Sequence, residues 1–265
     1  MDMNLKGRRA LVTGSTGGIG YGIAKALAEM GATVTINGRT PDRVRAAIAR
    51  LTEETGTTCF IAAPGDVATA SGAEALVKGL PAVDILVNNT GIFEPKPFFE
   101  IADEDWLRFY ETNVMSGIRL SRAYTPGMVE AGWGRVVFIS SESGLNIPVE
   151  MVHYGMTKTA QLAVSRGLAE TVAGSGVTVN SVLPGPTLSE GVADFMAKMA
   201  KDTAEVDLDK LGRDFVAEHR STSLIRRLAT VEEVASMVAY ICSPAASATS
   251  GAALRVDGGV IRHIA

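Results

Sequence analysis

The sequence has few aromatic residues, only two cysteines and no block of basic residues. Aromatic residues make up 6% of the chain, which argues against a base-stacking surface for nucleic acid. Lys and Arg are scattered and the formal net charge is −4, so no polyanionic partner is expected. Cys59 and Cys242 lie in apolar segments, a pattern typical of buried thiols in a reducing compartment. No His, Cys or carboxylate cluster has metal-ligand spacing, so no metal is expected.

The first residues also lack the features of a targeting signal. Residues 1–9 are charged from the start and contain no apolar segment of the signal-peptide kind. No apolar run reaches the ~18 residues that a membrane span needs. The sequence therefore predicts a soluble, cytoplasmic protein. It contains no repeat or linker, and 265 residues that are 46% hydrophobic can form one large core, so we predict a single domain over residues 1–265.

Strand-like and helix-like segments alternate along the chain. The apolar strand-like runs cover residues 10–13, 33–36, 57–62, 84–87, 135–140, 177–183 and 253–256. Between them lie amphipathic segments, including a long one from residue 103 to 124 and another from 152 to about 173. This rhythm predicts βαβ units and a parallel sheet with helices on both faces. Ligands of such sheets bind beyond the carboxyl ends of the strands, so the residues just after each strand should converge on one rim; they are Gly14, Gly38, Asp66, Asn88, Ser141 and Pro184.

A glycine-rich turn follows the first strand. Gly14, Gly18 and Gly20 would let the backbone approach a pyrophosphate, and the next helix would offer its free N–H groups. A glycine turn without a ligand is the alternative. The second strand favours the dinucleotide interpretation, because it ends near Gly38 and Arg39, where such folds meet the adenosine ribose.

A serine, a tyrosine and a lysine form a second group. Ser141 follows the fifth strand, while Tyr154 and Lys158 are four residues apart and so share one helix face. Together they could handle a proton on a carbonyl or alcohol oxygen, although a Y-x-x-x-K pair alone is a weak signal. His153 should point away from its neighbour Tyr154, and no G-x-S-x-G motif supports a serine hydrolase.

These residues together resemble the short-chain dehydrogenases/reductases over nearly the whole chain. The run from Thr13 to Gly20 matches the family's cofactor motif. The run from Asn88 to Gly91 matches its N-N-A-G motif, with Thr90 where alanine is usual. The other matches are Asp66 and Val67 beside the adenine, the tetrad Asn113, Ser141, Tyr154 and Lys158, and Pro184, Gly185 and Thr187 over the nicotinamide.

The resemblance implies a fold and a reaction. The fold is a Rossmann fold whose seven-stranded parallel sheet has the order 3-2-1-4-5-6-7. The reaction is hydride transfer between a nicotinamide and a carbonyl carbon. Tyr154 would be the general acid/base, Lys158 would lower the pKa of the phenol and hold the ribose, Ser141 would hold the substrate oxygen, and Asn113 would order a water. The implied cofactor-binding residues are Gly14, Ser15, Thr16, Gly18, Ile19, Gly20, Arg39, Asp66, Val67, Asn88, Thr90, Gly91, Tyr154, Lys158, Pro184, Gly185 and Thr187.

The end of the second strand favours NADP(H) over NAD(H). NAD enzymes of this fold usually place a carboxylate there, whereas this chain has Gly38 followed by Arg39, whose planar fork suits a 2′-phosphate. The alternative is that Arg39 only stacks on the adenine and allows both cofactors. The family's second basic position is Thr16 or Gly17 here, so this preference depends on one arginine.

The substrate and the assembly are less defined. Residues 188–228 resemble a helical lid with apolar side chains at Phe195, Met196, Met199, Leu211 and Phe215; a surface excursion with its own small core is the alternative. Much of the chain resembles 3-oxoacyl-carrier-protein reductases, but the docking positions Gly132, Glu170 and Ser175 are not basic. A small ketone, sugar acid or other secondary alcohol is therefore at least as good a substrate. The family is usually a homotetramer or homodimer, and a catalytically silent nucleotide-sensing or scaffolding protein is the competing function.

Overall fold

The computed structural model describes residues 1–192 and 207–264, and its centre is one parallel sheet. The seven strands have the order β3-β2-β1-β4-β5-β6-β9, which confirms the predicted order. The last strand of the sheet is β9 because two short strands, β7 (Thr187–Leu188) and β8 (Ala229–Thr230), pair separately. The sheet strands are β1 (Arg9–Val12), β2 (Thr33–Gly38), β3 (Phe60–Pro64), β4 (Ile85–Asn88), β5 (Gly134–Ile139), β6 (Val177–Pro184) and β9 (Ala253–Val256).

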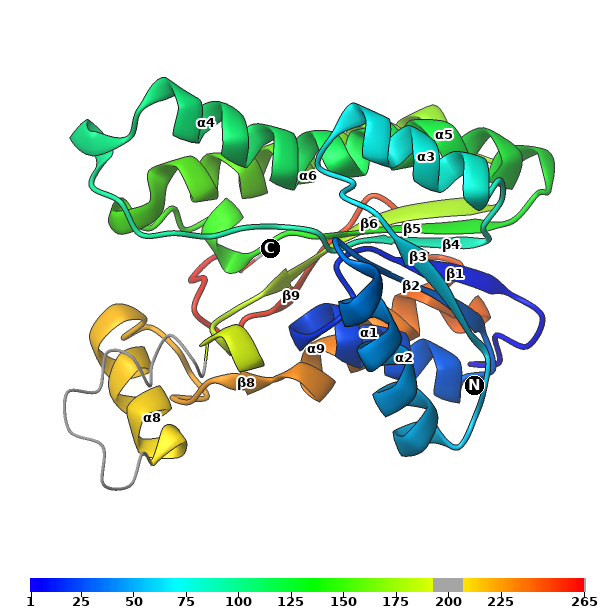
Figure 1. The fold of residues 1–265 in the computed structure, drawn as a ribbon. Coiled ribbons are helices and arrows are strands. Elements are labelled where there is room, and N and C mark those ends of the chain that lie inside the picture. The colour runs from blue at the N-terminus through cyan, green and yellow to red at the C-terminus, as the bar shows by residue number, and fades with distance from the viewer. Residues whose placement is uncertain (193–206, 265) are drawn as a thin grey trace.

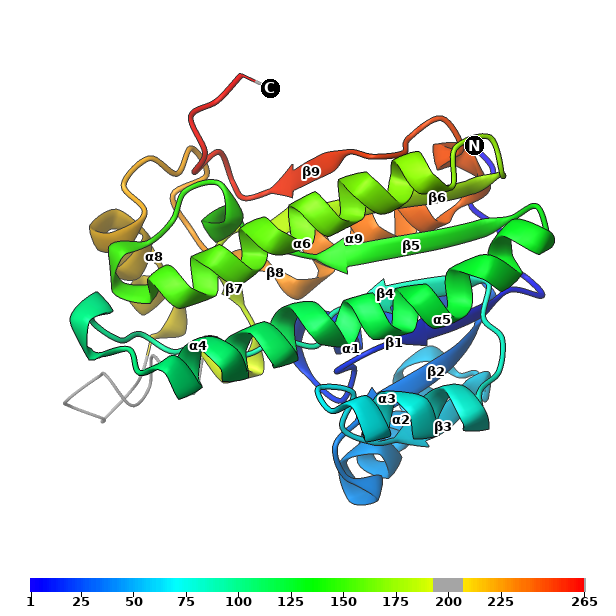
Figure 2. The ribbon, with the colours of Figure 1, turned by 90° about the horizontal axis from the view of Figure 1, so that it is seen from above.

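Helices cover both faces of this sheet, as predicted (Figure 1). One face carries α1 (Gly18–Glu29), α2 (Pro41–Thr55) and α9 (Val231–Cys242). The other carries α3 (Ala70–Gly79), α4 (Asp103–Tyr110), α5 (Ser116–Glu130) and α6 (Val152–Thr171). A further helix, α8 (Leu208–His219), lies beyond the ends toward which the strand arrows of β5 and β9 point (Figure 2). The short 3-10 turns are η1 (Phe98–Glu100), η3 (Glu142–Gly144), η4 (Val149–Met151) and η5 (Pro244–Ala246).

The sheet is buried between two apolar layers. Ile23 and Leu27 of α1 pack with Val234 and Val238 of α9 in a cluster on one face. Leu120 and Tyr124 of α5 belong to the cluster on the other face. Every residue of β4, β5 and β6 is buried, including the polar Thr178, Asn180 and Ser181 of β6, as expected for central parallel strands covered on both faces. Both cysteines are free; Cys242 is buried and Cys59 is partly buried.

Most predicted strands agree with the structure to within a residue at each end, but two predicted elements differ more clearly. The predicted helix from residue 103 to 124 is interrupted by a π-helical turn, η2 (Glu111–Met115), which places Asn113 in a widened turn between α4 and α5. The third strand begins at Phe60 rather than Thr57. Gly56 ends α2 in a left-handed conformation (φ 67°), and the pairing of β3 with β2 starts only where Phe60 meets Val34.

The described part of the predicted lid has a small core of its own. Val216 and Leu228 are buried there, with Leu188, Val192, Leu211 and Phe215 packed against them. The side chains of Leu211 and Phe215 therefore contribute to this separate cluster. The predicted lid residues Phe195, Met196 and Met199 lie outside the described residues. Within residues 1–192 and 207–264, no helix is both long and apolar enough to cross a membrane.

Candidate active site

The glycine turn after β1 is held tightly against the loop after β4. Gly14 and Gly18 have positive φ angles of 60° and 56°, which favour glycine. A Cβ atom on Gly20 would lie 2.5 Å from both Asn89 Nδ2 and the Gly14 carbonyl oxygen, so no larger residue fits there without a shift. The turn thus brings bare backbone to the start of α1, as a pyrophosphate site requires.

Two of the predicted cofactor residues have their side chains engaged in the fold. Ser15 is fully buried; its Oγ donates to the Val12 carbonyl oxygen (2.7 Å) and accepts from Asn37 N (3.0 Å). Asn88 donates from Nδ2 to Ser121 Oγ (3.1 Å), toward α5. Asn89 instead donates from its side chain to the carbonyl oxygens of Thr13 and Gly14. Sequence reasoning did not single out Asn89, although it stands in the same motif.

A hollow of about 350 Å³ lies beside the glycine turn and the end of β2. Its lining includes seven of the predicted cofactor-binding residues and Gly38 at the end of β2. The seven are Gly14, Thr16, Arg39, Asp66, Val67, Thr90 and Gly91. Arg43, on the first turn of α2, also lines it and was missed, because nothing local distinguishes it from the other arginines of that helix. Both Arg39 and Arg43 are exposed, and neither forms an ion pair with a carboxylate in the described parts of the chain.

The close approach of Thr16 explains why position 38 is glycine. A Cβ atom on Gly38 would overlap Thr16 Cγ2. A carboxylate side chain at this position would therefore require Thr16 to move. Arg39 and Arg43 thus line the hollow without an ion-pair partner among the described residues, and Asp66 and Arg108 also belong to its lining.

Ser141, Tyr154 and Lys158 come together at the carboxyl end of β5. Lys158 is 4% exposed, and its Nζ lies 5.5 Å from the centroid of the Tyr154 ring. Ser141 caps η3 by accepting from Ser143 N (3.1 Å), and its hydroxyl lies near enough to interact with the phenol. Phe93 packs edge-on against the Tyr154 ring. The structure thus places a hydroxyl, a phenol and an amine within one small volume.

Burial dominates the acid–base properties of this group. It raises the pKa of Tyr154 to about 12, while the Ser141 hydroxyl acts in the opposite direction. Burial also lowers the pKa of Lys158 to about 7. The lowering of the Tyr154 pKa by Lys158 stays a prediction; in the protein without cofactor, desolvation of the phenol is the largest influence on this pKa.

Asn113 makes hydrogen bonds with both its side chain and its backbone, and its expected role in ordering a water stays a prediction. Its Oδ1 accepts from Ile92 N (2.8 Å), and its Nδ2 donates to the Ile92 carbonyl oxygen and to Thr157 Oγ1 (3.0 Å each). These bonds lock the loop after β4 onto the π turn. The Asn113 carbonyl oxygen accepts from Gln161 (2.6 Å), whose Oε1 accepts from Lys158 Nζ (3.2 Å). Gln161, three residues after Lys158, is a third residue that sequence reasoning missed.

The opposite wall is formed where β6 ends. Gly185 N donates to the Val256 carbonyl oxygen (3.0 Å), and a Cβ on Gly185 would lie 2.8 Å from the Asp257 backbone. Thr187 donates to the Gly185 carbonyl oxygen (2.9 Å), and Pro184 closes β6. This tight turn holds the predicted nicotinamide loop against the end of β9.

His153 faces away from this group. Its ring packs 4.1 Å from Phe109, centroid to centroid, and also contacts Trp106; burial lowers its pKa. Nowhere in residues 1–192 and 207–264 do three or more His, Cys, Asp or Glu side chains gather as a metal site would need.

Comparison with known proteins places this geometry in a family. The family model for short chain dehydrogenases matches residues 8–200. The chain is 47% identical to YvaG of Bacillus subtilis (strain 168), an uncharacterized oxidoreductase, over 100% of both chains. It is 33% identical to the 3-oxoacyl-[acyl-carrier-protein] reductase FabG of Vibrio cholerae, over 97% of this chain and 99% of that protein.

Solved structures agree in the fold. L-sorbose reductase from Gluconobacter frateurii, complexed with NADPH and L-sorbose, superposes with a TM-score of 0.93 at 32% identity over 100% of both chains. A 7α-hydroxysteroid dehydrogenase complexed with NADH superposes with a TM-score of 0.84 at 29% identity, over 100% of this chain and 98% of that one. The chain therefore belongs to the short-chain dehydrogenase family of oxidoreductases.

Proposed function

We propose that this protein is an NADP(H)-dependent reductase that interconverts a ketone and a secondary alcohol. The observation that carries the proposal is the meeting of Ser141, Tyr154 and Lys158 beside the tight turn at Gly185, on the same rim as the glycine turn. The bound nicotinamide would supply the hydride. The residues of this chain would bind the cofactor, orient the carbonyl and manage one proton.

Tyr154 acts as the acid in reduction. With a pKa of about 12 the phenol keeps its proton at neutral pH, so a proton is available for the oxygen that receives negative charge. Ser141 donates a hydrogen bond to the same oxygen and stabilises its charge in the transition state. The protonated phenol suits the reductive direction at neutral pH.

Lys158 serves the reverse direction and the resupply of protons. When protonated, an ammonium 5.5 Å from the ring stabilises a phenolate by about 3 kcal/mol at an effective dielectric of ~20, or roughly two pKa units. Its own pKa of about 7 lets it gain and lose a proton near neutrality. Gln161 and the Ile139 carbonyl oxygen, which accept from its Nζ, hold it in place.

NADP(H) is the proposed cofactor because of the charges at the adenosine end. Arg39 and Arg43 line the hollow without carboxylate partners among the described residues, and Gly38 leaves no carboxylate to repel a 2′-phosphate. The NADPH complex of the similar sorbose reductase supports this choice, while the NADH complex of the steroid dehydrogenase shows that the fold accepts either cofactor.

A small polar ketone is the proposed substrate. The L-sorbose complex supports this class. The positions where a basic surface would receive an acidic carrier protein are Gly132, Glu170 and Ser175, and Glu170 forms an ion pair with Arg166 (2.8 Å). An acidic residue in that region disfavours an acidic carrier domain.

The test is a turnover screen with one tyrosine variant. NADPH oxidation is followed with L-sorbose, cyclohexanone and a 3-oxoacyl thioester, and Tyr154→Phe is compared with Tyr240→Phe, a tyrosine on α9 outside the site. We expect Tyr154→Phe to lose about 10²-fold or more in kcat/KM with unchanged cofactor affinity. A silent nucleotide-binding protein would bind NADPH and turn over none of the ketones. A Tyr154→Phe variant that keeps more than half the activity would exclude the proposed mechanism.

A further inference from the structure

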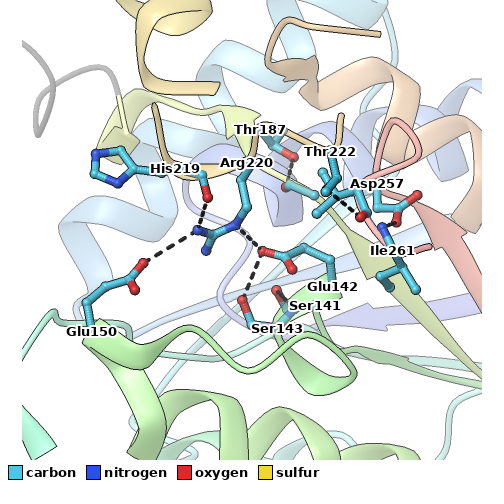
Figure 3. Close-up of polar contacts among 12 residues, drawn as sticks. Ser141, Glu142, Ser143, Glu150, Thr187, His219, Arg220, Thr222, Asp257 and Ile261 are labelled. Atoms are coloured by element: carbon cyan, nitrogen blue, oxygen red, sulfur yellow. Dashed lines mark hydrogen bonds and ion pairs between the residues drawn. The ribbon is translucent and has the colours of Figure 1, made fainter. Parts of the chain in front are cut away.

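A buried ion pair stands directly behind the catalytic serine. Glu142, the residue after Ser141, is 2% exposed, and its Oε1 accepts from Arg220 Nε (2.8 Å) and from Ser143 Oγ (3.1 Å) (Figure 3). Arg220 is 9% exposed. Ser143 N in turn donates to Ser141 Oγ (3.1 Å). Ser143 therefore bonds the serine hydroxyl through its backbone N and the Glu142–Arg220 pair through its Oγ, and so ties the two together.

Arg220 reaches this position from a distant part of the chain. It follows α8 and donates from Nη1 to the His219 carbonyl oxygen (2.8 Å), with a longer contact to Glu150 (3.5 Å). The Glu150 carbonyl oxygen accepts from Lys96 N (2.9 Å), which extends the connection to the loop before η1. One guanidinium thus joins the end of α8 to η3 and η4, the two turns that flank the entry to α6 (Figure 3).

We propose that Glu142 and Arg220 are a positioning pair for the catalytic group: the pair fixes the Ser141 turn against the end of α8, and its two opposite charges balance each other at the Tyr154 phenol. Neither residue is proposed to touch the substrate. This inference rests on the acid–base role proposed above for Tyr154.

The charges around Tyr154 support the balance. After burial and the Ser141 hydroxyl, the groups that act on the pKa of Tyr154 are Glu142, which raises it, and Arg220, which lowers it. The other groups that face this region are Lys158 on the same helix and Glu150 on η4, which is held by Arg220. From the loop before η1 comes the uncharged ring of Phe93, and His153 is turned toward Phe109. Removing the charge of one member should therefore leave the effect of the other member on the Tyr154 pKa uncompensated.

The experiment measures the ionisation of Tyr154 in two single variants. The phenolate is followed between pH 8 and 11.5 by ultraviolet difference spectroscopy, and the signal of the matching Tyr154→Phe protein is subtracted to remove the other four of the five tyrosines. We expect Glu142→Gln to raise the phenolate-to-phenol ratio at a given pH by about tenfold, and Arg220→Gln to lower it by about tenfold. The basic limb of the kcat/KM profile should move in the same opposite directions.

The controls separate a balance of charge from loss of structure. Arg227→Gln removes an arginine that pairs with Glu233 on the surface, and it should leave the Tyr154 ratio unchanged. Arg220→Lys keeps the charge and should remain within about threefold of the wild type. The double variant Glu142→Gln/Arg220→Gln removes both charges, so its ratio should return toward the wild type even if its thermal stability is lower.

The outcomes are distinct for the pair and for the proposed function. Shifts of the same sign in both single variants, or no shift in either, would overturn the balance, because a purely structural pair has no reason to give opposite signs. The spectroscopic titration needs no turnover. A protein that shows the opposite shifts but reduces no ketone would support the pair and refute the proposed function.

Discussion

The cofactor preference can be tested at Arg39 and Arg43, with the nearby Arg45 as a control. Arg39, just before α2, and Arg43, on α2, line the hollow beside the glycine turn, whereas Arg45 of α2 pairs with Asp42 and does not line it. A charge-assisted hydrogen bond to a 2′-phosphate contributes about 1.5–3 kcal/mol. Arg39→Leu should therefore lower kcat/KM for NADPH by roughly 10- to 150-fold and leave NADH nearly unchanged. Arg45→Leu should change neither.

The reverse change tests the role of the glycine. Gly38→Asp alone should impair both cofactors, because its Cβ overlaps Thr16 Cγ2, and overpacking of this kind costs about 1–3 kcal/mol. Adding Thr16→Ala removes the overlap. The combination Gly38→Asp/Thr16→Ala/Arg39→Leu should then favour NADH, since a carboxylate can accept from the ribose 2′-hydroxyl and repels a 2′-phosphate.

Initial rates with NADPH and NADH against one ketone provide the assay, and titration calorimetry with NADP⁺ and NAD⁺ replaces it if turnover is slow. The NADPH preference should also weaken as ionic strength rises, because the two arginines are exposed. A wild type that favours NADH would refute the reasoning. So would an Arg45→Leu variant that loses as much NADPH activity as Arg39→Leu.

Two further predictions concern the buried Lys158 and the space around two glycines, Gly20 and Gly167. Burial lowers the folded-state pKa of Lys158 to about 7, below its unfolded value, so protonation disfavours folding and the penalty fades as pH rises from 7 through 10.5. In urea unfolding, Lys158→Met should accordingly be more stable than the wild type by a few kcal/mol at pH 7. This difference in unfolding free energy should disappear toward pH 10. A difference that does not change with pH would contradict the prediction. Gly20→Ala should weaken cofactor binding by about tenfold or more, because the added Cβ meets Asn89 and Gly14. Gly167→Ala, with no atom within 4 Å of its Cβ, should instead stabilise the protein by about 0.5–1 kcal/mol. Equal effects of the two variants on cofactor binding in calorimetry and on thermal melts would show that the turn tolerates a side chain.

The sequence by itself determined the architecture and the composition of the rim. Alternating apolar runs and amphipathic segments predict a parallel sheet with helices on both faces, and the observed strand order is the one that the family resemblance implies. The glycine turn and the residues after each strand could be located because their chemistry is local: a positive φ at Gly14, a hydroxyl at a strand end, and a phenol and an amine on one helix face. These features depend on a few neighbouring positions.

Tertiary structure alone decided which groups touch. Whether Asn88 or Asn89 holds the glycine turn, and whether Arg43 joins Arg39, depends on the packing of β4 and α2 against the turn. The same holds for the acid–base character of Tyr154 and Lys158, because desolvation is a property of the surrounding atoms and no spacing encodes it. The Glu142–Arg220 pair joins residues 78 positions apart, and only the folded chain brings that guanidinium to the turn that follows Ser141.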